Sequence, residues 1–346
     1  MHSGDFADMR PVVLGHRLQV SPDGQVYGLV EEEGGEVLTV GDHRHCAEFL
    51  VQRLLELHGA GHLNLALPTL GATQFWADVY WFGAWRIQEN VLSGHHRLLD
   101  PSDTRHAWGS RNACRAVLER ERQIQGWVPD TRPLVVLLHG LGRSHSVWDS
   151  MAAALREQNY QVAALAYPST RRSIAEHAAQ LDDLLDDLEG PREVSFVTHS
   201  LGALVVRSSL AGNPDWSRDL RPQRVVMIAP PSQGSSLARS LADFLPFAMI
   251  AGPAARELAT DTLRTLPAPP CPFGILAAGR GAEDGYNPWL PGDDDGIVSI
   301  EETRLAGAAD HLVVHGLHTF IMNDPQTISA TLQFLQFGNF GGHSDR

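Results

Sequence analysis

Ser200 lies where an apolar strand pattern changes into an apolar helical pattern, within residues 194–210. A strand that turns sharply into a helix brings two backbones close together, and the small residues Thr198 and Gly202 stand on either side of the serine. Such a turn pushes the hydroxyl outward and leaves the next backbone amide unpaired at a helix N-terminus. The pattern predicts a serine that attacks a carbonyl carbon while the Leu201 amide helps to hold the oxyanion.

A helix cap is the alternative interpretation of Ser200, because serine is a preferred residue at the start of a helix. Capping requires neither the apolar strand before the serine nor the Leu-Gly-Ala sequence after it, so the nucleophile is the favoured interpretation. The pattern departs from Gly-x-Ser-x-Gly at Thr198, where a bulkier, β-branched side chain replaces the first glycine.

A second oxyanion donor is expected from the loop after an earlier strand. Residues 133–138 form a continuous apolar run, as expected for a central parallel strand that is covered on both faces. The run leads into His139-Gly-Leu-Gly, and we expect the Leu141 amide to be the donor. Each preorganised donor typically lowers the barrier by about 3 kcal/mol. An ordinary glycine turn is the alternative, but this turn precedes the serine motif by two strand–helix units.

A serine nucleophile also needs a base, and three histidines compete for that role. His311 opens the last predicted strand and His315 ends it, whereas His318 follows Gly316 just before the final helical segment. In the family that this chain's motifs resemble, named below, the chain order is serine, acid and then histidine before the last helix. We therefore expect His318 to be the base, with His315 as the runner-up.

The acid that orients the base is expected in the Gly-, Pro- and Asp-rich loop between these motifs. Its acidic residues are Glu283, Asp284, Asp293, Asp294 and Asp295. Asp295 is preferred because the adjacent Gly296 permits a tight turn that leads the chain back toward the sheet. A hard-cation site is the alternative for the three consecutive aspartates. Three adjacent carboxylates cannot all face one ion, so we expect no metal.

Taken together, four motifs resemble the α/β-hydrolase superfamily, in particular its bacterial lipases and esterases. They span residues 138–143, 197–203, 294–299 and 318–320, in the order and spacing of that family. The resemblance covers residues 133–337 and implies an α/β-hydrolase fold with a mostly parallel, doubly wound sheet.

Carried over residue by residue, the resemblance implies Ser200 as nucleophile, Asp295 as orienting acid and His318 as base. It implies an oxyanion hole made by the amides of Leu141 and Leu201. The implied reaction is hydrolysis of a small-molecule or lipid carboxylic ester through an acyl-enzyme, without a metal or organic cofactor. An acyltransferase with the same triad and a non-catalytic, hydrolase-like binding protein are the alternatives.

Six apolar runs that alternate with helical patterns are expected to form the parallel sheet that positions these residues. They are residues 134–138, 162–166, 194–197, 225–228, 273–277 and 312–314. Helices are expected over 174–188 and 327–337. We assign residues 131–340 to the catalytic domain.

Residues 1–130 are expected to be an α+β extension packed on this domain. An Asp-Gly turn between short β runs predicts strands within residues 17–30, and helices are predicted over 47–57 and 112–123. Aromatic residues are concentrated between 74 and 87, namely Trp76, Tyr80, Trp81 and Trp85. Core or interdomain packing is the favoured interpretation of these side chains, and a substrate platform is the alternative.

The apolar segment 235–266 is expected to bear on substrate choice. As a cap over the sheet edge, it would bind an acyl chain through Phe244, Phe247 and Met249. An ordinary crossover helix is an equally good interpretation.

Composition limits the remaining possibilities. The 346 residues, 43% of them hydrophobic, can bury a large core, and the net charge of −14 argues against a nucleic-acid partner. Cys46, Cys114 and Cys271 are widely spaced and odd in number, which predicts neither a disulfide framework nor a metal site. Because no signal-peptide pattern or membrane-spanning run is apparent, we expect a cytoplasmic protein without an integral membrane segment. The oligomeric state is not predicted.

Overall fold

A computed structural model describes residues 73–241 and 252–341, together with four strands nearer the N-terminus. These strands are β1 (Ala7–Val13), β2 (His16–Val20), β3 (Tyr27–Glu31) and β4 (Val37–Gly41), and they form an antiparallel sheet in that order. β2 and β3 confirm the strands predicted around the Asp-Gly turn. The helix predicted over 47–57 lies outside the described residues, as do Phe244, Phe247 and Met249.

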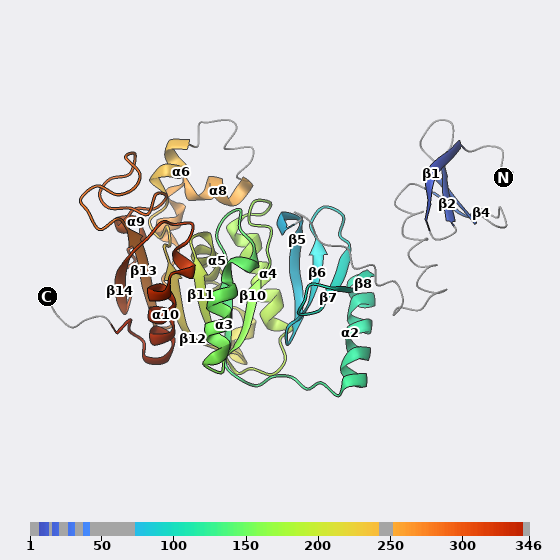
Figure 1. Cartoon of the computed structure of the whole chain (residues 1–346), viewed down its shortest axis with the longest axis horizontal. Coiled ribbons are helices and arrows are strands. Elements are labelled where there is room, and N and C mark those ends of the chain that lie inside the picture. The colour runs from blue at the N-terminus through green and yellow to red at the C-terminus, as the bar shows by residue number, and fades with distance from the viewer. Residues whose placement is uncertain are drawn as a thin grey trace.

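A six-stranded parallel sheet forms the centre of the protein, with the strand order β10-β9-β11-β12-β13-β14 (Figure 1). Its strands are β9 (Leu134–Leu138), β10 (Gln161–Leu165), β11 (Glu193–His199), β12 (Arg221–Ile228), β13 (Phe273–Gly279) and β14 (Asp310–His315). Every residue of β9 and β13 is buried, as expected when helices cover both faces of a sheet. All six predicted strands are confirmed.

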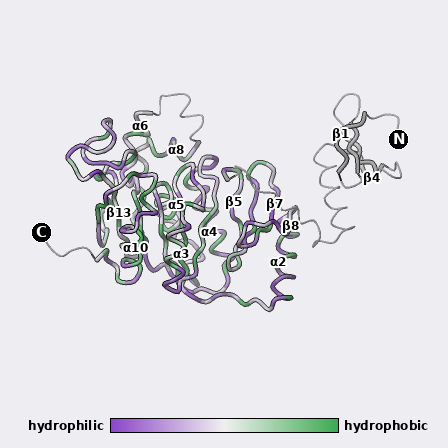
Figure 2. Tube along the Cα trace, in the orientation of Figure 1, coloured by the Kyte–Doolittle hydropathy of each residue, from purple (hydrophilic) through white to green (hydrophobic). Residues whose placement is uncertain are grey.

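Helices cover the two faces of this sheet, and two apolar clusters hold them there. One cluster joins alternate residues of β9 to α4 (Ile174–Asp186) and α5 (Leu201–Ala211). The other cluster joins the intervening residues of β9 to α3 (Asp149–Glu157) and α10 (Pro325–Phe337). Figure 2 shows the apolar strands between helices that alternate in hydropathy. Because successive residues of β9 contact helices on opposite faces, the sheet is covered on both sides, as in a doubly wound fold.

Shorter helices surround the sheet. They are α6 (Ser236–Leu241), α8 (Gly252–Leu258) and α9 (Ile300–Thr303), with 3₁₀ turns at Thr73–Phe75, His145–Trp148, Asp215–Arg218, Asp261–Thr265 and Ile321–Asn323. α6 and α8 lie together at one end of the sheet (Figure 1). Among the described residues, the structure contains no helix that is long and apolar enough to span a membrane.

A second antiparallel sheet and one helix precede the parallel sheet in the chain. Its strands, in spatial order, are β5 (Trp76–Phe82), β6 (Trp85–Asn90), β7 (His96–Leu99) and β8 (Arg105–Gly109), and helix α2 (Arg111–Gln125) packs on them. The Asp78 amide donates to the Ala166 carbonyl at 2.8 Å, just beyond β10. Tyr80 and Trp81 are buried, which agrees with the packing interpretation of the aromatic residues.

Candidate active site

The serine predicted to be the nucleophile stands on a strained turn between β11 and α5. Ser200 has φ 52° and ψ −119°, a conformation that is costly for a residue with a side chain and is often found at functional sites. Its amide donates to the Ile228 carbonyl at 2.9 Å, which fixes the turn against β12. The Ser200 hydroxyl makes no hydrogen bond to the described part of the chain, so it is available to a ligand.

Two glycines allow the chain to approach closely around this turn. A Cβ atom at Gly202 would lie 2.5 Å from the Leu138 carbonyl oxygen, so only glycine fits where α5 packs against the end of β9. A Cβ atom at Gly140 would lie 3.2 Å from the Cβ of Ser200. The loop that follows β9 therefore lies directly against the serine, as the sequence predicted for an oxyanion loop.

Thr198 occupies the position at which the common motif has glycine, and the structure explains how it fits. Its side chain is completely buried, and its hydroxyl donates to the Val226 carbonyl at 3.2 Å. Because this hydrogen bond satisfies the buried hydroxyl, the larger residue does not leave an unpaired polar group in the sheet.

The structure brings His318 and Asp295 together across 23 residues of sequence. His318 Nδ1 lies 2.7 Å from Asp295 Oδ2, and the His318 amide donates to the Asp295 carbonyl at 2.9 Å. The other carboxylate oxygen, Oδ1, accepts from the amides of Ile297 at 3.0 Å and Val298 at 2.8 Å. Gly296 has φ 96°, so the turn beside the acid does require glycine. The carboxylate is thus fixed by three hydrogen bonds and holds one ring nitrogen of the histidine.

The neighbouring acids make other contacts. Asp293 accepts from the amides of Arg280 at 2.7 Å and Gly281 at 2.9 Å, whereas Asp294 accepts from the amides of Asn287 at 3.0 Å and Gly296 at 2.7 Å. Glu283 and Asp284 are exposed. In the described ranges, no group of histidine, cysteine and acidic side chains is arranged to hold a metal ion.

The two other candidate histidines lie apart from this acid. His311 Nε2 is 3.1 Å from the Thr303 hydroxyl, and His315 is exposed beside Gly281. Neither histidine makes a hydrogen bond to a carboxylate in the part of the chain that the structure describes. Of the three candidates, only His318 has the acid partner that a catalytic base requires.

Two backbone amides near Ser200 remain free to bind an anion. The Leu201 amide lies at the N-terminus of α5, where the helix dipole favours negative charge. The Leu141 amide lies in the loop that contacts Ser200. Neither amide donates to an acceptor within the described residues.

A glutamine far away in the sequence holds the predicted oxyanion loop, and it is not among the predicted site residues. Gln74 Nε2 donates to the Arg143 carbonyl at 2.8 Å, while its Oε1 accepts from the Thr170 amide at 3.1 Å and hydroxyl at 3.0 Å. The Ser169 hydroxyl, 3.3 Å from the same Oε1, accepts from the Gly142 amide at 2.9 Å. No local pattern marks this residue, because its partners lie 69 to 96 positions away.

For the ester hydrolysis that the resemblance implies, the substitution Gln74→Leu is expected to lower kcat about tenfold and to change KM less than twofold. It removes hydrogen bonds that each contribute roughly 1 kcal/mol to holding the loop. Binding of a boronic acid, which imitates the tetrahedral intermediate, should weaken in parallel with kcat. Gln158→Leu, on the exposed end of α3, is the matched control. A change confined to KM, or none, would show that Gln74 does not position the loop.

Three buried histidines, two of them next to the predicted site and one on α4, are held in their neutral form. Burial lowers the pKa of His139 to about 3 and that of His177 to about 4. Burial also lowers the pKa of His199 well below its ordinary value, and the positive charge of a protonated His318 adds to this effect. His199 Nε2 lies 3.0 Å from the His318 carbonyl oxygen, so the neutral ring supports the backbone of the predicted base.

These histidines predict a loss of stability in mild acid. An unfolded histidine binds a proton below about pH 6.5, whereas the folded forms resist protonation, so their contribution is complete above that pH and falls below it. At pH 5.5 each such histidine should lower the free energy of unfolding by about 1.4 kcal/mol relative to neutral pH. Urea unfolding at pH 7.5 and 5.5 measures the difference. His177→Gln should reduce it by about one histidine's share, and an unchanged difference would contradict this assignment.

Comparison with known proteins identifies the family to which the fold belongs. A sequence profile described as the Alpha/beta hydrolase family matches residues 135–329, which is more than half of the chain. No curated protein matches the chain.

Several solved structures are similar to part of it. A lipase from Bacillus licheniformis in its propeptide form is 20% identical over 60% of this chain and half of that chain, with a TM-score of 0.48. A metagenomic carboxyl esterase is 23% identical over 54% of this chain and 65% of that chain, with a TM-score of 0.38. A thermophilic esterase from Thermogutta terrifontis is 16% identical over 61% of this chain and 92% of that chain, with a TM-score of 0.44.

Proposed function

Because the chain belongs to the alpha/beta hydrolase family, we propose that it is a serine-dependent hydrolase of carboxylic esters. The observation that carries this proposal is the 2.7 Å hydrogen bond between His318 and the buried Asp295, on a domain that presents Ser200 on a strained turn. A carboxylate that fixes one ring nitrogen leaves the other to act on the serine proton, which is the arrangement that acyl transfer requires.

In the proposed reaction, His318 removes the proton from Ser200 as the hydroxyl oxygen attacks the ester carbonyl carbon. The amides of Leu141 and Leu201 donate to the oxygen that becomes negative. The protonated histidine then gives its proton to the departing alcohol, and an acyl-enzyme remains on the serine. A water molecule, deprotonated by the same histidine, attacks the acyl carbon. The bond to the Ser200 oxygen then breaks, the histidine returns the proton to that oxygen, and the carboxylic acid leaves.

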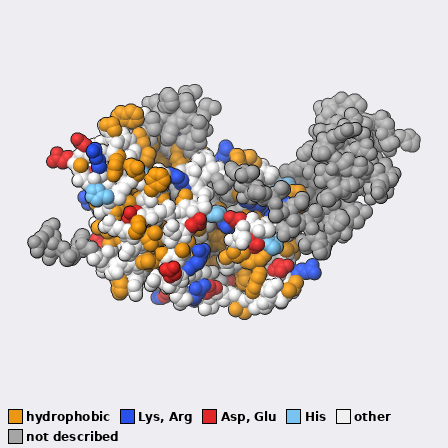
Figure 3. Space-filling view, viewed as in Figure 1, with side chains coloured by type: hydrophobic (Ala, Val, Ile, Leu, Met, Phe, Trp, Pro, Cys, Tyr) orange, Lys and Arg blue, Asp and Glu red, His pale blue; other side chains and the backbone are white. Residues whose placement is uncertain are grey.

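The surroundings of the site support an apolar ester as the substrate. Three apolar residues flank the predicted base and acid in the sequence, and between 41 and 66% of each residue's surface is exposed; they are Leu317, Phe320 and Ile297. Figure 3 shows that apolar side chains are spread among polar and charged ones on the visible face of the described part of the chain. Exposed apolar residues near a catalytic residue favour substrates with an apolar acyl or alcohol group.

A series of p-nitrophenyl esters tests this proposal and ranks the acyl chains that the protein accepts. We expect turnover with butyrate to octanoate esters and a lower kcat/KM with acetate. Adding an alcohol acceptor separates the alternative: an acyltransferase would form the new ester faster than it releases the acid. Failure to hydrolyse or transfer any acyl group would leave only the non-catalytic alternative.

A further inference from the structure

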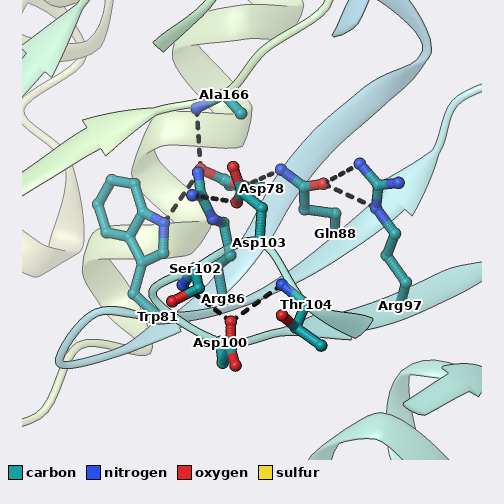
Figure 4. Close-up of polar contacts among 10 residues, drawn as sticks. All are labelled: Asp78, Trp81, Arg86, Gln88, Arg97, Asp100, Ser102, Asp103, Thr104 and Ala166. Atoms are coloured by element: carbon teal, nitrogen blue, oxygen red, sulfur yellow. Dashed lines mark hydrogen bonds and ion pairs between the residues drawn. The ribbon is translucent and has the colours of Figure 1, made fainter. Parts of the chain in front are cut away.

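A buried carboxylate lies at the junction between β5 and the parallel sheet. Asp78 is fully buried, and its oxygens accept from Gln88 Nε2 at 2.8 Å, Trp81 Nε1 at 3.1 Å and the Ala166 amide at 2.8 Å (Figure 4). Its charge is therefore stabilised by three neutral donors rather than by a contacting cation. Gln88 donates to one carboxylate oxygen through Nε2, and its side-chain carbonyl oxygen accepts from another residue.

That donor is an arginine without an acidic partner in contact. Arg97 Nε and Nη2 lie 2.9 and 2.7 Å from Gln88 Oε1, and the guanidinium carbon lies 3.9 Å from the centre of the Trp76 ring (Figure 4 shows the Gln88 contacts). Burial lowers the Arg97 pKa to about 10, which leaves it charged at neutral pH. Within the described residues, Arg97 forms no ion pair, and its Nη1 makes no hydrogen bond. The nearby Asp103 is paired with Arg86 at 2.5 Å.

This arginine faces a cavity of about 170 Å³ beside the oxyanion loop. Trp76 and Leu99 line it from the antiparallel sheet, and Tyr167 and His145 line it from the hydrolase domain. The Asp103 carboxylate also lines it, with its charge balanced by the Arg86 ion pair. The half-buried His145 makes no hydrogen bond to the described part of the chain. The lining therefore combines apolar side chains with Arg97 Nη1 and the His145 ring, neither of which makes a hydrogen bond to the described residues. A space of about 150 Å³ in a protein core accommodates a benzene ring.

We propose that this cavity, the Arg97 pocket, binds a small molecule with a carboxylate or phosphate group and a compact apolar body. The anion would accept from Arg97 Nη1 and from His145, and the apolar body would pack on Trp76 and Leu99. The positive charge of Arg97 would repel a cation. A neutral apolar ligand would leave Arg97 Nη1 without an acceptor. A carboxylate or phosphate oxygen would supply an acceptor for Arg97 Nη1, which does not donate to Gln88.

The position of the pocket connects it to the proposed reaction. His139 and Ser144 both line the cavity, and they stand on the two sides of Leu141 in the chain. An occupant therefore contacts both ends of the loop that contains the predicted oxyanion donor. The anion has two possible sources, namely a charged group on the substrate itself or a separate small molecule.

Calorimetric titration of the whole protein with benzoate tests the pocket without relying on the proposed reaction. We expect benzoate to bind at least tenfold more tightly than benzyl alcohol, and inorganic phosphate to bind more weakly than benzoate because it lacks the apolar body. Arg97→Met should weaken benzoate binding at least tenfold. Arg218→Met, which removes the same charge from an 80% exposed side chain, is the control and should bind benzoate like the wild type.

Two milder variants guard against misfolding of Arg97→Met. Arg97→Lys keeps the charge and His145→Gln keeps a donor, and each folded variant should bind benzoate at least threefold more weakly. The proposal is overturned if the wild type binds neither anion, or if folded Arg97 variants bind benzoate like the wild type.

Hydrolysis then separates the two sources of the anion. If the substrate supplies it, Arg97→Met should raise KM at least tenfold for a p-nitrophenyl ester with a terminal carboxylate and leave its methyl ester unaffected. If a separate molecule supplies it, benzoate binding should be lost while both esters keep their KM ratio. Both results support the pocket, because each requires an anion that depends on Arg97.

Discussion

Ser200→Ala is expected to abolish ester hydrolysis, with kcat reduced by a factor on the order of 10⁵ to 10⁶. The substitution removes the atom that forms the acyl-enzyme, so the burst of p-nitrophenol before steady state should disappear as well. The fold should persist, because the Ser200 hydroxyl makes no hydrogen bond to the described residues. Initial rates and circular dichroism of the purified variant measure the two effects.

Ser217→Ala provides the matched control for this substitution. Its hydroxyl donates only to the Pro214 carbonyl, in the turn after α5 and away from the predicted oxyanion loop. The control should keep wild-type kcat. Residual activity of Ser200→Ala within a hundredfold of the wild type would mean that another residue is the nucleophile.

His318→Ala should lower kcat by about 10⁵, whereas His315→Ala should keep it within threefold of the wild type. The difference is expected because His318 has Asp295 at 2.7 Å, while the exposed His315 has no carboxylate partner in the part of the chain that the structure describes. Steady-state rates with one p-nitrophenyl ester give both values. The reverse order would assign the base to His315.

Asp295→Asn separates the role of the acid from that of the base. The amide can keep a hydrogen bond to the histidine, but it favours the wrong tautomer and cannot stabilise the protonated ring. We expect kcat to fall by about 10⁴. Asp293→Asn, whose carboxylate accepts from the amides of Arg280 and Gly281, should have a much smaller effect. Equal losses in the two variants would argue that the loop, and not the acid, is what matters.

The strands of the parallel sheet, and the motifs that follow them in the chain, could be predicted because both depend on local sequence patterns. Strands buried on both faces appear as continuous apolar runs, and β9 is such a run from end to end. The serine turn and the glycine beside Asp295 are also local, since φ of 52° and 96° must be accommodated by the residues at those positions and their neighbours. Chain order predicts His318, and the glycine at 296 favours Asp295 among the five acids; the structure adds the contact between them.

Long-range contacts could not be predicted from the sequence. Gln74 lies 69 positions before its partner Arg143, and nothing around it distinguishes it from other glutamines. The Arg97 pocket likewise depends on side chains of two separate sheets, so only their packing brings them together. Thr198 departs from the glycine of the common motif, and the hydrogen bond that accommodates its hydroxyl could not be predicted because the acceptor, the Val226 carbonyl, lies on the neighbouring strand.

The most direct test of the central proposal is intact-mass analysis after reaction with a fluorophosphonate, followed by peptide mapping. We expect one adduct per chain, located on Ser200, absent from Ser200→Ala and formed at least a hundredfold more slowly by His318→Ala. Such a result would require an activated serine at the turn between β11 and α5. An unlabelled wild-type protein, or a label on another residue that persists in Ser200→Ala, would contradict the account.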